Sequence, residues 1–270
     1  MEHATDAPTI TANIDLAIGT RRLRAAIKVP TGPMRLVELL PVIHAVADAV
    51  VAAGVADAEA AGERLSCRKG CAACCRHLVP VAEVEARRIR DLVAELPEPR
   101  RSAVRERFAE VRRRLEAAGL LRPLLQAETI TEDERGAAGV RYFLQAIPCP
   151  FLEEEACSIY AERPLSCRDY VVTSPPENCS LPTPETVRRV PLAINMWQAM
   201  DAAGERAGPR RPWVPLALAP EWADAHPDMT APRPGPEILR QVFESLTGKE
   251  LPQATPAPGV DAAGAATGTP

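Results

Sequence analysis

Aromatic residues are scarce in this sequence, at 4% of 270 residues, and charge is nearly balanced, with a formal net charge of −4. A chain without an excess of basic residues offers no general electrostatic attraction for nucleic acid. The first residues, Met1 to Asp6, form neither the basic nor the apolar segment of an export signal. The composition therefore predicts a cytoplasmic protein with no nucleic-acid partner.

Uninterrupted apolar runs and common catalytic motifs are missing as well. The most apolar stretch, Leu36 to Val55, contains a glutamate, a proline, a histidine and an aspartate, so we expect it to be too polar to span a bilayer. No Ser-His-Asp pattern, H-E-x-x-H motif or phosphate-binding loop supports hydrolysis or nucleotide use. We therefore expect no membrane partner, and catalytic residues are unknown.

Cysteine is also uncommon, at 8 of 270 residues, well below the share typical of a disulfide-stabilised scaffold. Thiols in a reducing cytosol serve as metal ligands or redox groups more often than as bridges. All eight lie between residues 67 and 179, and four of them fall within nine residues. We predict that all eight are metal ligands: Cys67, Cys71, Cys74, Cys75, Cys149, Cys157, Cys167 and Cys179.

The spacing of these thiols favours iron–sulfur clusters over zinc. Structural zinc sites usually use paired C-x2-C units, and only Cys71 and Cys74 have that spacing. Irregular all-cysteine ligation with a Cys-Pro step, as at Cys149, also occurs in iron–sulfur proteins. Adjacent Cys74 and Cys75 are awkward ligands for one ion and easier ligands for two neighbouring centres. Residues 67–75 form either a helix with all four sulfurs on one side or a loop.

The apolar pattern predicts a mainly α protein with an N-terminal β-hairpin, in which a helical bundle surrounds a cysteine-ligated metal site and the C-terminal half is rich in loops. Period-two alternation predicts a hairpin over 9–33. A single helical metal-chelating domain over 34–250, with its cysteine core at 65–180, follows. We expect disorder at 1–8 and 251–270. The expected helices are 34–61, 80–96, 100–118, 132–145, 185–203 and 236–246.

The helix expected at 100–118 is rich in arginine, which alone could indicate a nucleic-acid surface. Glutamates are interleaved with these arginines at helical spacing, so we favour a solvated, salt-bridged surface.

Several residues other than cysteine are candidates for supporting roles. His77 follows Cys75 closely enough to be a ligand, although eight thiols already suffice for two four-coordinate sites. His44 lies on an apolar helical stripe and is expected to be a satisfied core histidine. Tyr160, Arg163 and Arg168 either donate hydrogen bonds to cluster sulfurs or neutralise thiolate charge. In the alternative, the two arginines pair with nearby carboxylates at Glu153, Glu154 or Asp169.

At its cysteines the sequence resembles the YkgJ-type cysteine-cluster family, whose shared domain is described as zinc- or iron-chelating. The resemblance rests on Cys67-x3-Cys71-x2-Cys74-Cys75, Cys149-Pro-Phe-Leu, Cys157-Ser-Ile-Tyr and Arg163-Pro-x2-Cys167-Arg, and it covers about residues 65–180. Flagellin lysine N-methylase is similar in these segments, which implies that a relative can couple an iron–sulfur cluster to methyl transfer. This chain has no G-x-G turn of the dinucleotide-type methylase fold, so that activity is not carried over.

Three functions follow from these patterns. The first is a cytosolic metal-chelating protein that binds one or two iron–sulfur centres for electron transfer or as an accessory to an enzyme. The second is a structural zinc protein that binds a protein partner. The third is a methyltransferase-like or other redox enzyme. The spacing Cys67-x3-Cys71-x2-Cys74 also fits a radical-SAM motif, but Ala73 replaces its usual aromatic residue and helices follow where a barrel is needed.

Overall fold

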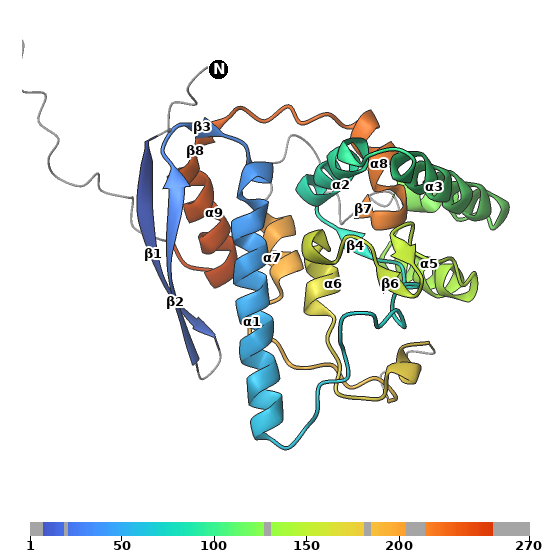
Figure 1. Cartoon of the computed structure of the whole chain (residues 1–270), viewed down its shortest axis with the longest axis horizontal. Helices are drawn as coiled ribbons and strands as arrows, with labels where there is room; N and C mark the ends of the chain where they lie inside the picture. The colour runs from blue at the N-terminus through green and yellow to red at the C-terminus, as the bar shows by residue number, and fades with distance from the viewer. Residues whose placement is uncertain (1–7, 19–20, 127–130, 181–184, 204–213, 251–270) are drawn as a thin grey trace, which may run out of the picture.

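The computed structural model describes residues 8–18, 21–126, 131–180, 185–203 and 214–250. The described residues are mostly helical, with an N-terminal β-hairpin and small two-stranded sheets, which confirms the expected fold class (Figure 1). The segments expected to be disordered, 1–8 and 251–270, lie outside the described residues apart from residue 8.

The hairpin consists of β1 (Thr9–Ile18) and β2 (Arg21–Pro30), paired antiparallel with Leu16 opposite Leu23. Its alternating apolar side chains form one face, which packs on helices α1 (Leu40–Ala60) and α9 (Gly235–Thr247) (Figure 1). Leu16 and Val29 are buried there. An isolated hairpin is marginal in water, so this contact with the helices stabilises it.

The first helical segment is a 3₁₀ turn, η1 (Leu36–Leu39), that continues into the long helix α1 (Leu40–Ala60). By length and composition alone this segment could cross a membrane, so the expectation that it is too polar to do so is wrong. The same test is passed by core helices of soluble proteins, and 39% of its most apolar window is buried inside the protein. Length and composition are therefore weak support for a membrane span.

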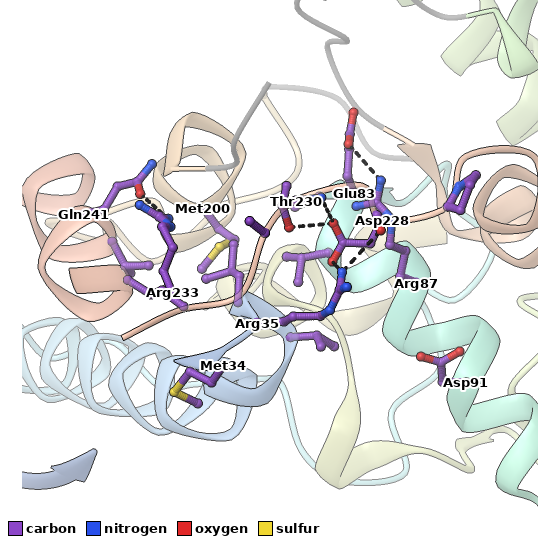
Figure 2. A pocket seen from close by; sticks show the side chains of 18 of the residues that line it. Met34, Arg35, Glu83, Arg87, Asp91, Met200, Asp228, Thr230, Arg233 and Gln241 are labelled. Carbon is purple, nitrogen blue, oxygen red and sulfur yellow. Dashed lines mark hydrogen bonds and ion pairs between the residues drawn. The ribbon is translucent and has the colours of Figure 1, made fainter. Parts of the chain in front are cut away.

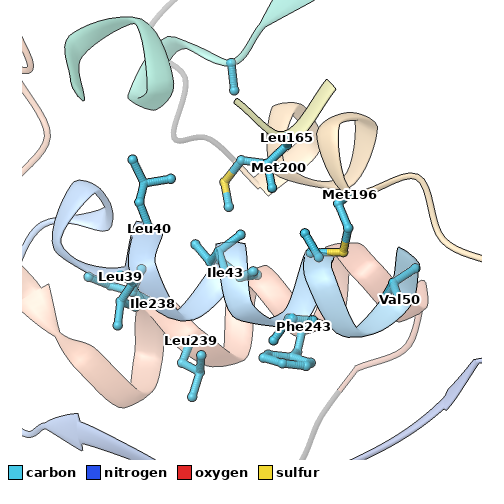
Figure 3. Close-up of a cluster of buried hydrophobic side chains, with 14 of the residues drawn as sticks. Leu39, Leu40, Ile43, Val50, Leu165, Met196, Met200, Ile238, Leu239 and Phe243 are labelled. Atoms are coloured by element: carbon cyan, nitrogen blue, oxygen red, sulfur yellow. The ribbon is translucent and has the colours of Figure 1, made fainter. Parts of the chain in front are cut away.

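The buried face of α1 belongs to an apolar core that includes the hairpin, α7 (Met196–Ala203) and α9 (Gly235–Thr247). Figure 3 shows Ile43 of α1 beside side chains of the other helices, with Leu165 of α6 (Leu165–Asp169) reaching the same core. The core also contains Leu39, Leu40, Val50, Met196, Met200, Ile238, Leu239 and Phe243.

Two glycines allow close packing around this core. A Cβ added at Gly54 of α1 would lie 2.8 Å from Leu192 Cδ2, and one at Gly235 would lie 2.6 Å from Met34 Sδ. Gly235 begins α9 where β8 (Arg233–Pro234) pairs with β3 (Pro33–Met34). A side chain at either position would push these segments apart.

The other half of the protein contains α2 (Glu83–Glu95), α3 (Arg100–Ala117), α4 (Leu121–Leu125), α5 (Glu132–Leu144), η5 (Leu216–Leu218) and α8 (Ala219–Ala225). A short antiparallel sheet of β4 (Pro80–Val81) and β7 (Val214–Pro215) joins the segment before α2 to the segment before η5. Two apolar cores fill it, one around Trp222 and Phe151 and one around Leu115 and Tyr142. Trp222 therefore lies in the core, whereas Trp213 lies outside the described residues.

Helix α3 has the predicted salt-bridged surface. Arg113 pairs with Glu106 and Glu110 along the helix, and Arg112 pairs with Glu116 and with Glu221 of α8. Arginine and glutamate at helical spacing thus neutralise one another on this surface.

The helix expected over 185–203 begins only at Met196. The preceding residues run alongside the segment after α6, where the Val190 N–H donates to the Val171 carbonyl at 2.9 Å and the Thr173 N–H donates to the Arg188 carbonyl at 3.0 Å. These long-range backbone bonds, together with a proline at position 191, outweigh the helical pattern of Val187, Val190 and Ile194.

Candidate metal centre

The first cysteine group, residues 67–75, forms a series of tight turns, so the loop alternative is confirmed and the helical one is wrong. The Cys71 N–H donates to the Arg68 carbonyl at 3.0 Å, and the Cys75 N–H donates to the Ala72 carbonyl at 2.9 Å. Gly70 has a φ of +87°, a conformation that glycine adopts without steric cost. A glycine between the first two cysteines thus turns the chain where a helix would have continued.

The second group is supported by short elements: β5 (Leu152–Glu153), β6 (Ala156–Cys157), η3 (Tyr160–Glu162), α6 and η4 (Pro176–Ser180). Phe151, Ile159 and Leu165 of this segment are buried in the apolar cores. Ion pairs also hold it, from Arg107 of α3 to Glu153 and from Arg88 of α2 to Glu162. Cys157 and Cys167 are therefore carried on anchored turns.

Backbone hydrogen bonds hold the two cysteine groups against each other. The Cys149 N–H donates to the Cys75 carbonyl at 2.8 Å, and the Val172 N–H donates to Cys67 Sγ at 3.3 Å. His77 Nε2 lies 2.7 Å from the carbonyl oxygen of Cys179, where the ring nitrogen is the donor. Thiols far apart in the sequence are thus brought to one region of the fold.

All eight cysteines are free, and Cys179 is buried while the other seven are partly exposed. Burial, and to a smaller extent charge on nearby thiols including Cys74, raise the pKa of Cys149 to about 12. Burial also raises the pKa of Cys167, and charge on Cys74 contributes there too. A hydrogen bond with Cys75 and then burial raise the pKa of Cys74 itself. Cys74 therefore interacts electrostatically with thiols of both groups.

The donor set suits a soft metal, but the side chains do not form a closed site. Thiolates are ligands of zinc and of iron–sulfur clusters. Within the described residues, no three His, Cys, Asp or Glu side chains are placed to hold a metal ion as they stand. Binding would have to deprotonate the thiols and draw their sulfurs together, and metal ligation is coupled to both changes. The assignment of all eight cysteines as ligands thus stays a prediction.

Arg163 and Lys69 place positive charge over the Tyr160 ring beside the thiols. The Arg163 guanidinium lies over the Tyr160 ring, 4.3 Å from its centroid, and the Lys69 ammonium lies 6.0 Å from the same centroid. The positive charge of Arg163 favours the ionised form of Cys67, Cys74 and Cys157, although their pKa values stay raised, chiefly by burial at Cys67 and Cys157 and by the Cys75 hydrogen bond at Cys74. Arg163 is therefore placed to compensate thiolate charge.

Arg168 binds neither a thiol nor one of the carboxylates expected from the sequence, but pairs with Asp48. Its Nη1 donates to both carboxylate oxygens of Asp48 on α1, each at 2.7 Å, and its Nε donates to the Arg163 carbonyl at 2.9 Å. The Arg168 side chain is 4% exposed. It also donates to the Ala161 carbonyl. Arg168 thus joins the turn before Cys167 to a helix outside the cysteine segment.

Sequence reasoning did not predict that two carboxyl groups beside this turn are buried. Glu85 accepts from the Leu165 N–H at 2.7 Å and from the Ala82 N–H at 3.0 Å, and burial raises its pKa to about 7. Asp169 accepts from the Trp197 N–H at 3.1 Å, and burial raises its pKa to about 6. Glu85 had a detectable signal, because a glutamate three residues after a helix N-cap often bonds back to the cap.

His77 and His44, the two histidines considered above, lie among packed side chains. His77 contacts Phe143 and Tyr170 edge to face, in addition to its bond with the Cys179 carbonyl. His44 is buried on α1 as expected, but its Nε2 has no hydrogen-bond partner among the described residues, so the expectation of a satisfied side chain is wrong. Burial, and then the charge of Arg168, lower the pKa of His44 to about 4.

Comparison with known families identifies the cysteine segment. Residues 66–184 match the family model CxxCxxCC, whose description is "Putative zinc- or iron-chelating domain". The chain therefore carries a metal-binding cysteine-cluster domain of this family, which includes all eight cysteines. The same comparisons find no match among curated proteins or solved structures.

Proposed function

We propose that the CxxCxxCC domain at residues 66–184 binds one or two iron–sulfur centres through its eight cysteines. The observation that carries this proposal is that hydrogen bonds hold the two cysteine groups against each other, from the Cys149 N–H to the Cys75 carbonyl and from the Val172 N–H to Cys67 Sγ. Charge on Cys74 influences the pKa of Cys67 in its own group and of Cys149, Cys157, Cys167 and Cys179 in the other. An ion or cluster between the groups would replace these unfavourable thiol contacts with ligation.

The number of thiols and the Cys74–Cys75 pair favour two centres. Eight thiolates supply two four-coordinate sets, and adjacent residues more easily serve neighbouring centres than one. The cationic Arg163 would offset part of the negative charge that thiolate ligation brings to the site. In this proposal Arg163 and Tyr160 support the site, whereas Arg168 supports the turn that carries Cys167.

The protein would act in the cytoplasm, in electron transfer or as an accessory to an enzyme. A bound cluster supplies a redox couple, whereas the chain's own residues hold it, offset its charge and limit the access of water. A structural zinc site that serves a protein interaction surface is the alternative, and the same thiols would be its ligands.

Elemental analysis with visible absorption spectroscopy tests the metal directly. Protein made and kept without oxygen should contain iron and acid-labile sulfide and absorb visible light. Stoichiometric zinc, with no visible absorption and no sulfide, would overturn the iron–sulfur proposal in favour of the structural zinc site.

The Cys75→Ser variant tests the two-centre arrangement. Serine keeps the shape of cysteine but is a harder and poorly ionised ligand, so loss of metal reports ligation. We expect about half the iron and half the sulfide to remain, with a changed spectrum. Ala73→Ser, in the same turn, is the matched control and should retain full metal content. Unchanged metal in Cys75→Ser, or complete loss of metal and fold, would contradict two separate centres.

A further inference from the structure

The two edges of the N-terminal hairpin are unusual, because β1 and β2 form a sheet of their own among the described residues. A sheet of only two strands leaves one row of backbone N–H and C=O groups unpaired along each edge. In the cavity drawn in Figure 2, by contrast, Arg35 pairs with Asp228 at 3.0 Å and Arg87 with Glu83 at 3.3 Å, so these charges are matched within the chain. Backbone pairing with a further strand is therefore possible at the hairpin.

The outward-facing backbone groups of β1 belong to its odd-numbered residues. The Thr31 N–H donates to the Pro8 carbonyl at 2.8 Å, so the pair formed by residues 8 and 31 is hydrogen-bonded. Hydrogen-bonded and non-hydrogen-bonded pairs alternate along an antiparallel ladder. The even-numbered residues of β1 therefore bond to β2, and the odd-numbered ones direct their N–H and C=O groups away from it. These outward-facing residues are Thr9, Thr11, Asn13, Asp15 and Ala17.

The edge of β1 lacks the residues that commonly prevent strand addition. Proline and basic side chains protect many exposed edges, and β1 contains neither over its ten residues. Its one charged residue, Asp15, is already paired with Arg22 at 2.8 Å. In Figure 1 β1 forms the outer margin of the hairpin, with β2 between it and α1. The β1 edge is therefore open to a further strand.

The edge of β2 is protected in the usual way. Its outward-facing positions, which lie opposite the odd-numbered residues of β1, include three basic residues and a proline. These residues are Arg22, Arg24, Lys28 and Pro30. Strand addition is thus favoured at one edge of the hairpin and disfavoured at the other.

The core-facing side of β1 is only partly covered. Leu16 is buried, but Ala12 and Ile14 are half-buried, and Ile10 is 36% exposed. A strand that continues the sheet past β1 would extend this apolar face and cover Ile10. The β1 edge thus offers hydrocarbon as well as backbone hydrogen-bonding groups.

The solvent-facing side of β1 is compatible with a second copy of itself. In an antiparallel pair of β1 strands centred on Asn13, Thr11 lies opposite the partner's Asp15. Thr9 then lies opposite the partner's Ala17, and the outward-facing residues pair along the full length of the strand. No like charges face each other in this register, whereas a register centred on Asp15 would place two carboxylates directly opposite, which is destabilising.

The core-facing side matches in the same register. Ile10 lies opposite the partner's Leu16, and Ala12 lies opposite the partner's Ile14. Apolar side chains therefore oppose apolar ones at every core-facing pair, and such cross-strand pairs stabilise a sheet. One register thus satisfies the backbone groups, the charges and the apolar face together.

We propose that two copies of this chain associate through their β1 strands, which pair antiparallel about Asn13 and form one continuous sheet with two strands from each copy. The pairing has two-fold symmetry, so each copy contributes the same surface and the assembly closes as a dimer. Addition of a strand at an open edge is a recurrent mode of protein recognition. No cysteine lies in the hairpin, so the contact does not depend on which metal the thiols bind.

Sedimentation velocity of the full-length, metal-loaded protein under reducing conditions measures the assembly. We expect a concentration-dependent equilibrium between monomer and dimer, because each copy has one open β1 edge and the pairing uses both. A monomer at every concentration up to the solubility limit would overturn the proposal.

Two proline variants place the contact at the β1 edge. Asn13→Pro removes an outward-facing N–H at the centre of the pair, and proline is tolerated where the N–H of an edge strand faces solvent. It should leave the monomer folded and abolish dimerisation. Ala26→Pro is the matched control, because Ala26 lies opposite Asn13 and its N–H faces the other edge of the hairpin. It should dimerise as the parent does. A dimer that survives Asn13→Pro, or one that is lost equally in both variants, would refute the β1 contact.

Substitution of Thr11 tests the register, and it decides the question if circular dichroism shows that a proline variant fails to fold. Thr11→Asp places a carboxylate opposite the partner's Asp15, and the two-fold axis makes this contact occur twice. It should weaken dimerisation several-fold. Within one copy the new carboxylate faces Lys28 across the hairpin, so the monomer is not destabilised. Thr11→Asn is the neutral control and should dimerise as the parent does. Equal dimerisation of the two Thr11 variants would overturn the proposed pairing.

Discussion

The flank and the cysteine segment of this protein are stabilised in different ways. In the flank, the hairpin, α1, α7 and α9 share one continuous apolar core whose side chains interlock (Figure 3). In the cysteine segment, irregular turns are fixed at a few buried anchors, such as Phe151, and by hydrogen bonds and ion pairs. Between those anchors lie thiols with raised pKa values and no closed ligand set. Apolar packing thus accounts for the order of the flank. In the cysteine segment we expect metal binding to add order that packing does not supply.

Removing the metal should produce the largest difference between the stability of the cysteine segment and that of the flank. Chelation should increase protease cleavage at exposed turns within 145–182 and leave the helices at 34–61 and 100–118 intact, because metal binding and ordering of its ligands are coupled. Limited proteolysis with mass spectrometry measures the cleavage sites. Equal protection of all regions in the metal-free protein would show that the buried anchors alone order the segment.

Leu165→Ala should destabilise both regions together. Leu165 is fully buried and carries α6, which bears Cys167, into the flank core. Truncating a buried leucine typically costs about 2–5 kcal/mol. Urea unfolding should show this loss as a single lower transition. A separate transition for the cysteine segment, with the flank unaffected, would mean that the two regions unfold independently.

The buried Glu85 should make stability depend on pH. Its pKa is raised to about 7 by burial, so the folded protein keeps a proton that the unfolded chain releases above the ordinary value of 4.5. Stability from this group is therefore present below pH 4.5 and lost as pH rises to 7, by at most about 1.4 kcal/mol per pH unit. Glu85→Gln should remove that dependence, apart from a constant offset for one lost acceptor.

His44 titrates with the opposite sign, since its pKa is lowered to about 4 and its contribution is lost as pH falls from 6.5. Comparing two proteins that differ only at position 85 cancels this effect. Parallel stability curves for the parent and Glu85→Gln between pH 5 and 7 would contradict the raised pKa.

The Asp48–Arg168 pair should contribute a smaller amount. Asp48→Ala removes the carboxylate partner of a guanidinium that is 4% exposed, which should cost about 1–3 kcal/mol. Asp57→Ala on the same helix is the control, because its partner Arg21 is 48% exposed and such surface pairs contribute under about 1 kcal/mol. Thermal unfolding of both variants measures the difference. A loss at Asp57 equal to that at Asp48 would rule out a special role for burial.

Substitution on the arginine-rich surface should have the smallest effect. Arg113 is 62% exposed and pairs only along its own helix with Glu106 and Glu110 among the bonds observed. Arg113→Ala should change the free energy of unfolding by under about 0.5 kcal/mol. A loss above 1 kcal/mol in the same urea titration would show that this surface is structurally important.

Periodicity was sufficient to predict elements that pack through one continuous face. The hairpin, α1, α3, α5 and α9 all begin and end close to the expected residues. The pattern failed over 185–195, where backbone bonds to residues 171–173 replace a helix. A propensity averaged along the chain contains no information on such distant partners.

The candidate site shows the same limit. The eight thiols and their family follow from residue type and spacing, because covalent proximity brings four of them together. The partner of Arg168 could not be predicted, since Asp48 is 120 residues away and closer carboxylates were available. Likewise the burial of Glu85 depends on how α6 packs against α2 rather than on either helix alone.

The bond between Asp48 and Arg168 shows that the start of the family match and the start of the structural unit are different positions in the chain. Sequence similarity to the cysteine family begins at residue 66, but the physical unit begins earlier, on a helix that the family model does not cover. A shortened chain starting at residue 66 would retain every thiol and leave behind the carboxylate that neutralises a buried guanidinium. In this protein the cysteine domain therefore depends on the preceding helix for an acid within reach of its buried guanidinium.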